Sequence, residues 1–135
     1  MVRISTRYTG EKRCELTHEP SKSVIRTDAP KDNNGKGELF SPTDLLAAAT
    51  ASCMLTVIGI HAEKDGLNVD GITASVDKEM GTNPRRVVKL HLSIHLPEKL
   101  TAEQREKLET LALNCPVKKS LHPELDVPVN FSYDL

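Results

Sequence analysis

The chain has 135 residues, with 18 basic and 19 acidic side chains and a formal net charge of -1. No segment concentrates one sign of charge, and aromatic residues are scarce, with no Trp, two Phe and two Tyr. Nucleic acids and anionic membranes bind basic surfaces, and single-stranded nucleic acids also stack on aromatic rings. The composition therefore argues against both partners. It predicts a single domain, residues 1–135, with an aliphatic core of modest size.

The first segments of the chain alternate in the manner of half-buried strands. Residues 2–9 alternate between apolar or β-prone side chains and polar ones, and residues 13–18 repeat the pattern. Residues 23–27 are a third candidate strand, and the polar, Gly-containing segment 28–37 is predicted to be a loop. Because a strand pattern occupies the start of the sequence, we expect no cleavable signal peptide.

A long helix is predicted to begin at Ser41. Ser41 is a suitable N-cap, Pro42 fits the first helical position, and Asp44 stands where a capping box needs its acceptor. The helical pattern continues to Lys64, and Gly66 suits the left-handed conformation that often ends a helix.

The middle of this helix, residues 45–62, is almost continuously apolar and approaches the length of a membrane span. Its hydrophobicity is weak, because it is rich in alanine and contains several polar or small residues: Thr50, Ser52, Thr56, Gly59 and His61. Segments with the pattern of a soluble sheet flank it. We therefore interpret it as a buried helix of a protein without a membrane partner.

The second half of the chain adds three strands and a helix. Residues 72–76 alternate, residues 87–96 do so strictly, and a capping box at Thr101 starts the second helix. Residues 127–133 form the last strand, which Pro128 places at a sheet edge. Three strands, helix, two strands, helix and strand make an α+β domain. These strands can cover only part of a helix that is apolar on every side, so we expect a homodimer.

The three cysteines suggest redox chemistry. Their odd number and their spacing match no zinc motif and favour a reducing, cytoplasmic compartment. Cys53 lies in the middle of the small-residue helix, and Cys115 opens the segment Cys115-Pro116-Val117. A thiolate that attacks a peroxide becomes a sulfenic acid, which a second thiol converts to a disulfide. The pair is chemically sufficient for peroxide reduction, although packing as small hydrophobes stays an open alternative.

The remaining candidates are interpreted as structural. Cys14 lies on the apolar-leaning face of a strand, where packing is the simpler role. His91 and His95 share a strand face with Lys89 and Ser93, which indicates a solvated face rather than a metal site. His61 is interpreted as a partner of the helix dipole. Arg85 and Arg86 are interpreted as surface charges, although one of them could bind an anion. No phosphate loop, serine elbow or zinc-protease motif is present, and no metal or cofactor is expected.

Two motifs resemble those of a known family. The segment 40–53, Phe-Ser-Pro-Thr-Asp-Leu-Leu-Ala-Ala-Ala-Thr-Ala-Ser-Cys, resembles the helix signature of the OsmC/Ohr family of osmotically inducible and organic hydroperoxide resistance proteins. Cys115-Pro116-Val117, followed by Ser120-Leu121, resembles its second cysteine motif. The order of elements matches along essentially the whole chain, which looks most like the OsmC-like branch. The resemblance implies an intertwined homodimer, with two central helices enclosed by sheets from both subunits.

The resemblance also implies an activity. The implied activity is that of a thiol-dependent peroxidase, which reduces organic hydroperoxides and also hydrogen peroxide. The implied role of this activity is defence against oxidative stress. Carried over to this chain, Cys53 would be the peroxidatic thiol and Cys115 the resolving thiol. The family needs no metal or organic cofactor, and a dithiol, notably on a lipoylated protein, recycles its disulfide.

The chain departs from the family pattern around the peroxidatic thiol. Family peroxidases carry a glutamate ten residues before the first cysteine, which orients an arginine; here Thr43 occupies that position, with Asp44 beside it. The first hairpin offers Arg7 and Arg13, of which we place Arg13 first. An arginine near Cys53 would stabilise the thiolate and the departing alkoxide. Arg13 and Asp44 thus join the two cysteines as candidate catalytic residues.

The same departure motivates an alternative function. The chain could be a non-catalytic stress or ligand-binding module that keeps both cysteines without efficient turnover and holds a ligand in an apolar interface pocket. A thiol–disulfide exchanger acting on proteins fits less well, because the sequence has no Cys-x-x-Cys motif.

Overall fold

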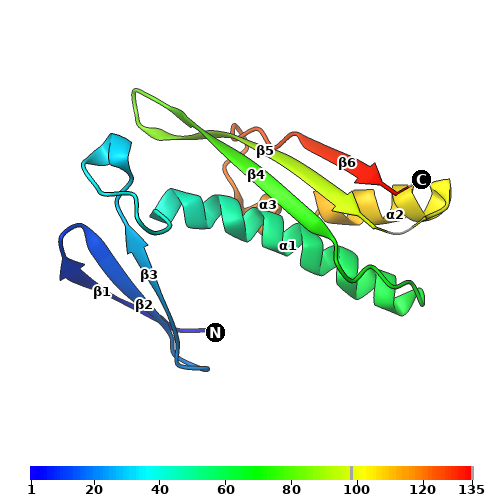
Figure 1. Cartoon of the computed structure of the whole chain (residues 1–135), viewed down its shortest axis with the longest axis horizontal. Coiled ribbons are helices and arrows are strands. Elements are labelled where there is room, and N and C mark those ends of the chain that lie inside the picture. The colour runs from blue at the N-terminus through cyan, green and yellow to red at the C-terminus, as the bar shows by residue number, and fades with distance from the viewer. Residues whose placement is uncertain (98, 135) are drawn as a thin grey trace. The chain divides into compact units, whose positions relative to one another are not determined.

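The computed structural model describes residues 1–97 and 99–134 and has an α+β fold with two three-stranded sheets and one long helix (Figure 1). The elements follow the predicted order, and a short helix precedes the last strand. The chain divides into two compact units, Met1–Leu46 and Ala47–Leu135.

The first unit contains an antiparallel sheet of three strands, β1 (Ile4–Gly10), β2 (Arg13–His18) and β3 (Ser23–Asp28), in the order β1-β2-β3. The predicted loop after β3 contains one turn of 3-10 helix, Lys31–Asn33. The strand register aligns apolar side chains on one face of the sheet, and that face stays largely open within the described chain. Its exposed large side chains are Ile4, Tyr8 and Ile25.

Helix α1 (Pro42–Lys64) begins with the predicted capping box. The Asp44 amide donates to Ser41 Oγ at 3.0 Å, and the Ser41 amide donates to Asp44 Oδ2 at 2.9 Å. These two bonds satisfy amides that have no partner inside the helix. Beyond the helix, Gly66 has a φ of 71°, the left-handed conformation expected there.

One side of α1 is buried and the other is open. By length and apolar composition alone α1 could cross a membrane, a test that core helices of soluble proteins also pass. Here, however, its buried side chains contribute to a packed core with a sheet and a second helix. The open side carries small or apolar residues: Ala49, Ser52, Thr56 and Ile60.

The second unit is built on the sheet β4-β5-β6. β4 (Thr73–Gly81) pairs antiparallel with β5 (Arg86–Leu96), and β6 (Val129–Tyr133) runs parallel to β5 at the sheet edge that Pro128 predicted. β4 continues five residues beyond the predicted segment 72–76, to Gly81. Asp77 and Glu79 at that end lie on the exposed face and, with Lys78 between them, pair with β5, so polarity did not mark the end of the strand.

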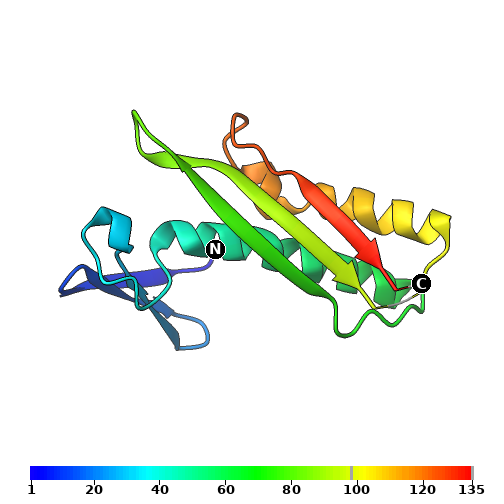
Figure 2. The same ribbon diagram turned by 45° about the horizontal axis from the view of Figure 1, so that its top comes forward.

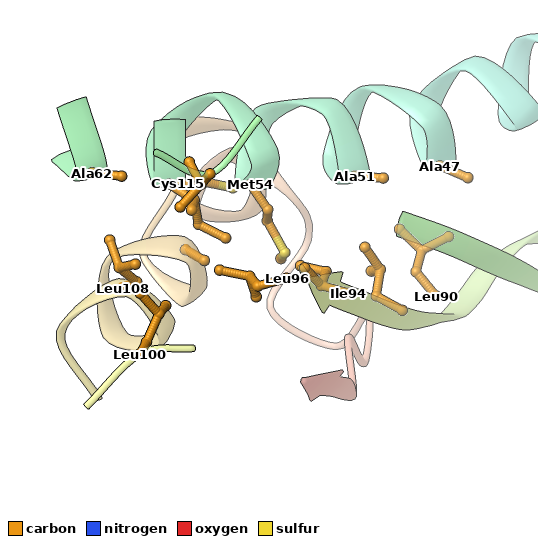
Figure 3. Close-up of a cluster of buried hydrophobic side chains, with 14 residues drawn as sticks. Ala47, Ala51, Met54, Ala62, Leu90, Ile94, Leu96, Leu100, Leu108 and Cys115 are labelled. Carbon is orange, nitrogen blue, oxygen red and sulfur yellow. The ribbon is translucent and has the colours of Figure 1, made fainter. Parts of the chain in front are cut away.

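Helices α1 and α2 (Ala102–Leu113) cover the same face of this sheet (Figure 2). α2 starts with the predicted capping box between Thr101 and Gln104, and the short helix α3 (Pro116–Ser120) follows it. Figure 3 shows small side chains of α1 above the β5 side chains, with Leu108 of α2 alongside. Close approach of α1 to the sheet explains the alanine-rich sequence of the helix. The β5 residues in this core are Leu90, Leu92, Ile94 and Leu96.

Candidate active site

The structure brings Cys53 and Cys115 together. Cys53 lies in the middle of α1 and is partly exposed, whereas Cys115 immediately precedes α3 and is 0% exposed. The two thiol groups are within hydrogen-bonding reach of each other, and neither is in a disulfide. Both belong to the second unit, so one compact body holds the pair.

Cys115 is held in place by the start of α3. Its Sγ caps the helix by accepting a hydrogen bond from the Lys118 amide at 3.5 Å, and Pro116 occupies the first helical position. The cysteine is part of the core cluster that also contains Met54 and Leu108 (Figure 3). Burial raises the pKa of the Cys115 thiol, the Lys118 amide opposes this, and the neighbouring Cys53 raises the pKa further. Cys115 is therefore a protonated thiol at neutral pH.

The two thiols differ in access to solvent, and this difference separates their chemical roles. A dissolved oxidant can reach the partly exposed Cys53, while the core shields Cys115. The α1 residues Ala49, Ser52 and Thr56 next to the open side of Cys53 are small, so they leave space for a substrate. An accessible sulfur in contact with a buried one can be oxidised first and then form a disulfide.

Arg13, the first residue of β2, forms ion pairs with two carboxylates of the same unit. Its Nη2 lies 2.8 Å from Glu38 Oε2 and 3.4 Å from Asp28 Oδ2. The Glu38 hydrogen bond, together with the charges of Asp28 and Glu38, raises the pKa of Arg13, so the guanidinium is always charged. Arg13 belongs to the first unit and Cys53 to the second, and a role of Arg13 toward Cys53 stays a prediction.

Asp44 has a structural role at the start of α1. Its Oδ2 accepts the Ser41 amide, and its own amide is bound by Ser41 Oγ. Thr43 Oγ1 lies 3.2 Å from Ser41 Oγ in the same turn. A catalytic role of Asp44 remains a prediction. Arg7, the other hairpin arginine, pairs with Glu15 at 3.6 Å.

The histidines of β5 lie on the solvated face of the sheet. His91 Nε2 is 3.7 Å from Glu79, and the ring of His95 bridges Ser132 Oγ at 2.7 Å and Asp134 Oδ1 at 2.9 Å. Among residues 1–97 and 99–134, no group of three or more His, Cys, Asp or Glu side chains could hold a metal ion. Arg86 donates hydrogen bonds to the backbone oxygens of Thr82 and Pro84 in the β4–β5 turn. The interpretation of Arg86 as a surface charge did not include these two contacts.

The carboxylates around Arg13 were also missed by sequence reasoning. Asp28 ends β3, and Glu38 stands beyond the polar loop, so the two are far from Arg13 in sequence. A hollow of about 390 Å³ next to them is lined by Glu38, Asp44, Gly37 and the exposed apolar residues Leu39 and Phe40. In the sequence, the only indication of this cluster is that acidic residues flank the polar loop after β3 on both sides.

Comparisons with known proteins show which family the chain resembles. Residues 35–130 match the model of the OsmC-like protein family. A protein from Psychrobacter arcticus 273-4, described as an osmotic stress induced and detoxification response protein, is 42% identical. The match covers 99% of this chain and 96% of that chain, with a TM-score of 0.91.

Two more distant structures share the fold. An organic hydroperoxide resistance protein OsmC from Legionella pneumophila is 18% identical, with 100% of this chain and 97% of that chain covered and a TM-score of 0.71. An organic hydroperoxide resistance protein from Elizabethkingia anophelis is 15% identical, with 99% of this chain and 95% of that chain covered and a TM-score of 0.74. A comparison with curated proteins gives no match. The family model covers most of the sequence and the 42% identical structure nearly all of it, and the chain therefore belongs to the OsmC-like protein family.

Proposed function

We propose that this protein is a cysteine-based peroxidase of stress defence that reduces organic hydroperoxides. The observation that carries the proposal is the contact between an accessible thiol, Cys53, and a buried thiol, Cys115. The relative from Psychrobacter arcticus, described as a stress and detoxification protein, supports the stress-related role. The two distant structures named as organic hydroperoxide resistance proteins support the choice of substrate.

The reaction proceeds in two steps on the enzyme. The Cys53 thiolate attacks the terminal oxygen of the hydroperoxide, the O–O bond breaks, and the departing alkoxide takes a proton to give an alcohol. Cys53 is left as a sulfenic acid. Cys115 then attacks the Cys53 sulfur as a thiolate, and hydroxide leaves and is protonated to water. The two thiols thus supply the two electrons, and an external dithiol, such as that of a lipoylated protein, reduces the disulfide.

Arg13 and Asp44 complete the proposed set of catalytic residues. The Arg13 guanidinium would stabilise the Cys53 thiolate and the negative charge on the departing alkoxide. Asp44, which is next to Thr43, is the candidate carboxylate to take the place of the family's glutamate. Support for Arg13 comes from its permanent charge and from its carboxylate partners, which hold the guanidinium in one place.

We also propose that the protein acts as a cytoplasmic homodimer. The first sheet leaves Ile4, Tyr8 and Ile25 exposed on one face, and α1 leaves Ile60 exposed on its open side. A three-stranded sheet needs a packed apolar face to be stable, and a second copy of the chain can supply the packing. The three free cysteines fit a reducing compartment.

Substitution of single cysteines tests the peroxidase proposal. Reduced wild-type protein, mixed with cumene hydroperoxide without reductant, should consume one equivalent of peroxide and form a Cys53–Cys115 disulfide. Cys53→Ser should consume peroxide only at the background rate, because the remaining thiols are not the nucleophile. Cys14→Ser, which removes a thiol from the first unit, is the matched control and should behave as wild type. If Cys53→Ser consumed peroxide as fast as wild type, the proposal would be wrong.

A non-catalytic module remains the second candidate, and Thr43 is the residue that favours it. If Thr43, in place of the family's glutamate, leaves the Cys53 thiol without activation, wild-type protein should consume peroxide no faster than Cys53→Ser. Cys53 should then react with iodoacetamide at the rate and pH midpoint of an ordinary exposed thiol.

A further inference from the structure

We propose that the second unit binds a small carboxylate with an aliphatic chain, at the place where the β4–β5 turn meets the segment after α3. A hollow of about 340 Å³ occupies this place, and ligand pockets in proteins begin at about this size. Neither cysteine of the thiol pair lines it, so the site is additional to that pair. The lining combines three aliphatic side chains, Val87, Val88 and Leu125, with three polar ones, Arg86, His122 and Glu124.

Arg86, the first residue of β5, supplies the positive charge of the site. Its Nη1 donates to the backbone oxygens of Thr82 at 3.1 Å and Pro84 at 2.9 Å, so the β4–β5 turn holds the guanidinium in one orientation. A guanidinium binds a carboxylate through two parallel hydrogen bonds, and its Nε and Nη2 form one edge that does so. Within residues 1–97 and 99–134 neither of these nitrogens has a partner. The turn therefore presents an oriented cation that no carboxylate of the described chain neutralises.

His122 supplies a second hydrogen-bond donor. The Glu124 amide donates to His122 Nδ1 at 3.1 Å. A ring nitrogen that accepts a hydrogen bond carries no proton, so the proton of this ring is on Nε2. The Leu125 amide donates to the His122 carbonyl at 2.9 Å, which closes the turn that carries these side chains. Arg86 and His122 are both exposed, so a ligand can reach their donors from solvent.

A bulge in the β4–β5 ladder shapes the apolar wall. The strand register shifts between Glu79 and Met80, which leaves Val88 of β5 without a partner on β4. Bulges redirect side chains and are frequent next to functional sites. Gly81 makes room for this arrangement, because a Cβ at that position would overlap Val88 Cγ1 and would lie 3.4 Å from Arg86 Nη1. The backbone of β4 thus allows the valine and the guanidinium to come close to it.

The class of ligand follows from the volume, the walls and the charges. The guanidinium edge and the His122 N–H are suited to one carboxylate group, and the aliphatic walls are suited to a short branched chain. Glu124 adds a negative charge to the lining, which disfavours anions with more than one charge, such as phosphate. The simplest molecule with all of these properties is 3-methylbutanoate, which we choose as the probe.

The experiment titrates the full-length, reduced protein with 3-methylbutanoate and follows its backbone amide signals by NMR. We expect the signals of Val88 and Leu125 to shift with a dissociation constant of about 1 mM, because the probe has few atoms. Acetate lacks the branched chain, and 3-methyl-1-butanol lacks the charge. Each should bind at least about tenfold more weakly, and so should phosphate.

Substitution of Arg86 tests the role of the guanidinium. Arg86→Gln should raise the dissociation constant for 3-methylbutanoate at least about tenfold, because it removes a charge-assisted pair of hydrogen bonds. Arg85→Gln is the matched control, since it removes the same charge one residue earlier, from a side chain that does not line the hollow. This control should bind the probe as tightly as wild type. Thermal unfolding of both variants checks that the fold is intact.

Three results would overturn the inference. Equal weakening by Arg86→Gln and Arg85→Gln would show only a general attraction of anions to the turn. Equal affinity for acetate or phosphate and for 3-methylbutanoate would show that the aliphatic walls do not select the ligand. Signals of Val88 and Leu125 that stay fixed up to about ten times the expected dissociation constant would show that nothing binds. No peroxide is used in these measurements, so this inference and the proposed function succeed or fail separately.

Discussion

At the residue scale, the environment of Cys115 fits the second step of the proposed reaction. A thiol attacks only as its thiolate, and burial raises the pKa of Cys115, so little of the thiolate is present at neutral pH. Cys115 is also 0% exposed, which prevents direct attack on a dissolved peroxide. Its contact with Cys53 would give it one target, the sulfenic acid of the proposed first step.

The raised pKa of Cys115 predicts a pH dependence for disulfide formation. Because the thiolate fraction below the pKa grows tenfold per pH unit, resolution of the Cys53 sulfenic acid should speed up about tenfold per unit from pH 7 upward, levelling off above the pKa. Rapid quenching followed by mass spectrometry would follow the sulfenic acid and the disulfide at several pH values. In Cys115→Ala, the sulfenic acid should persist at every pH and react with dimedone. A resolution rate that is flat from pH 7 to pH 9 would contradict the assignment.

Residue types could be predicted from the sequence, but their contacts could not. Cys53 and Cys115 were identifiable as a candidate pair, because both stand in recognisable motifs. Spacing alone does not determine whether two sulfurs meet; that depends on Cys115, the N-cap of α3, being packed in the same core as α1. The ion pairs of Arg13 were not predictable for the same reason. They require the chain to return from the loop after β3 to the beginning of β2.

At the scale of elements, capping chemistry defines where the helices begin. Both α1 and α2 start with the reciprocal pair of hydrogen bonds that their sequences indicate, Ser41 with Asp44 and Thr101 with Gln104. Such signals are local, so the sequence was sufficient to place both helix starts. The end of β4 depends instead on pairing with β5, which a single sequence does not reveal.

The capping box of α1 predicts a measurable contribution to stability. Ser41→Ala removes the acceptor for the Asp44 amide at a position that is almost fully buried, and we expect a loss of about 1 kcal/mol in the free energy of unfolding. Urea titration of both proteins gives this difference. Thr101→Ala, the equivalent change in α2, is the matched control and should cost a similar or smaller amount, because Thr101 is exposed. A Ser41→Ala variant as stable as wild type would show that the box does not stabilise α1.

At the scale of the whole molecule, the order of elements followed from the sequence because each element has a clear periodicity. The strict alternation of residues 87–96 became the central strand of the second sheet, and the almost uniformly apolar segment 45–62 became most of α1. Packing within the second unit accounts for only one side of α1, since the other side of the helix is exposed although it is also apolar. Among the described residues of the second unit, the open side of α1 therefore has no packing partner.

Ile60 provides a direct test of the proposed dimer. It is 48% exposed on the open side of α1, where a charged residue would have to be buried against the second copy. We expect wild type to sediment as a dimer at micromolar concentration and Ile60→Glu to raise the dissociation constant at least about a hundredfold, since an unpaired charge in an apolar interface costs several kcal/mol. Leu113→Glu places the same charge on an apolar residue of α2 that is 37% exposed and serves as the control. Sedimentation velocity over a concentration series distinguishes the cases. If wild type is monomeric throughout, or if Ile60→Glu associates as tightly as wild type, the open side of α1 is not the dimer interface, and its apolar character must serve a different partner.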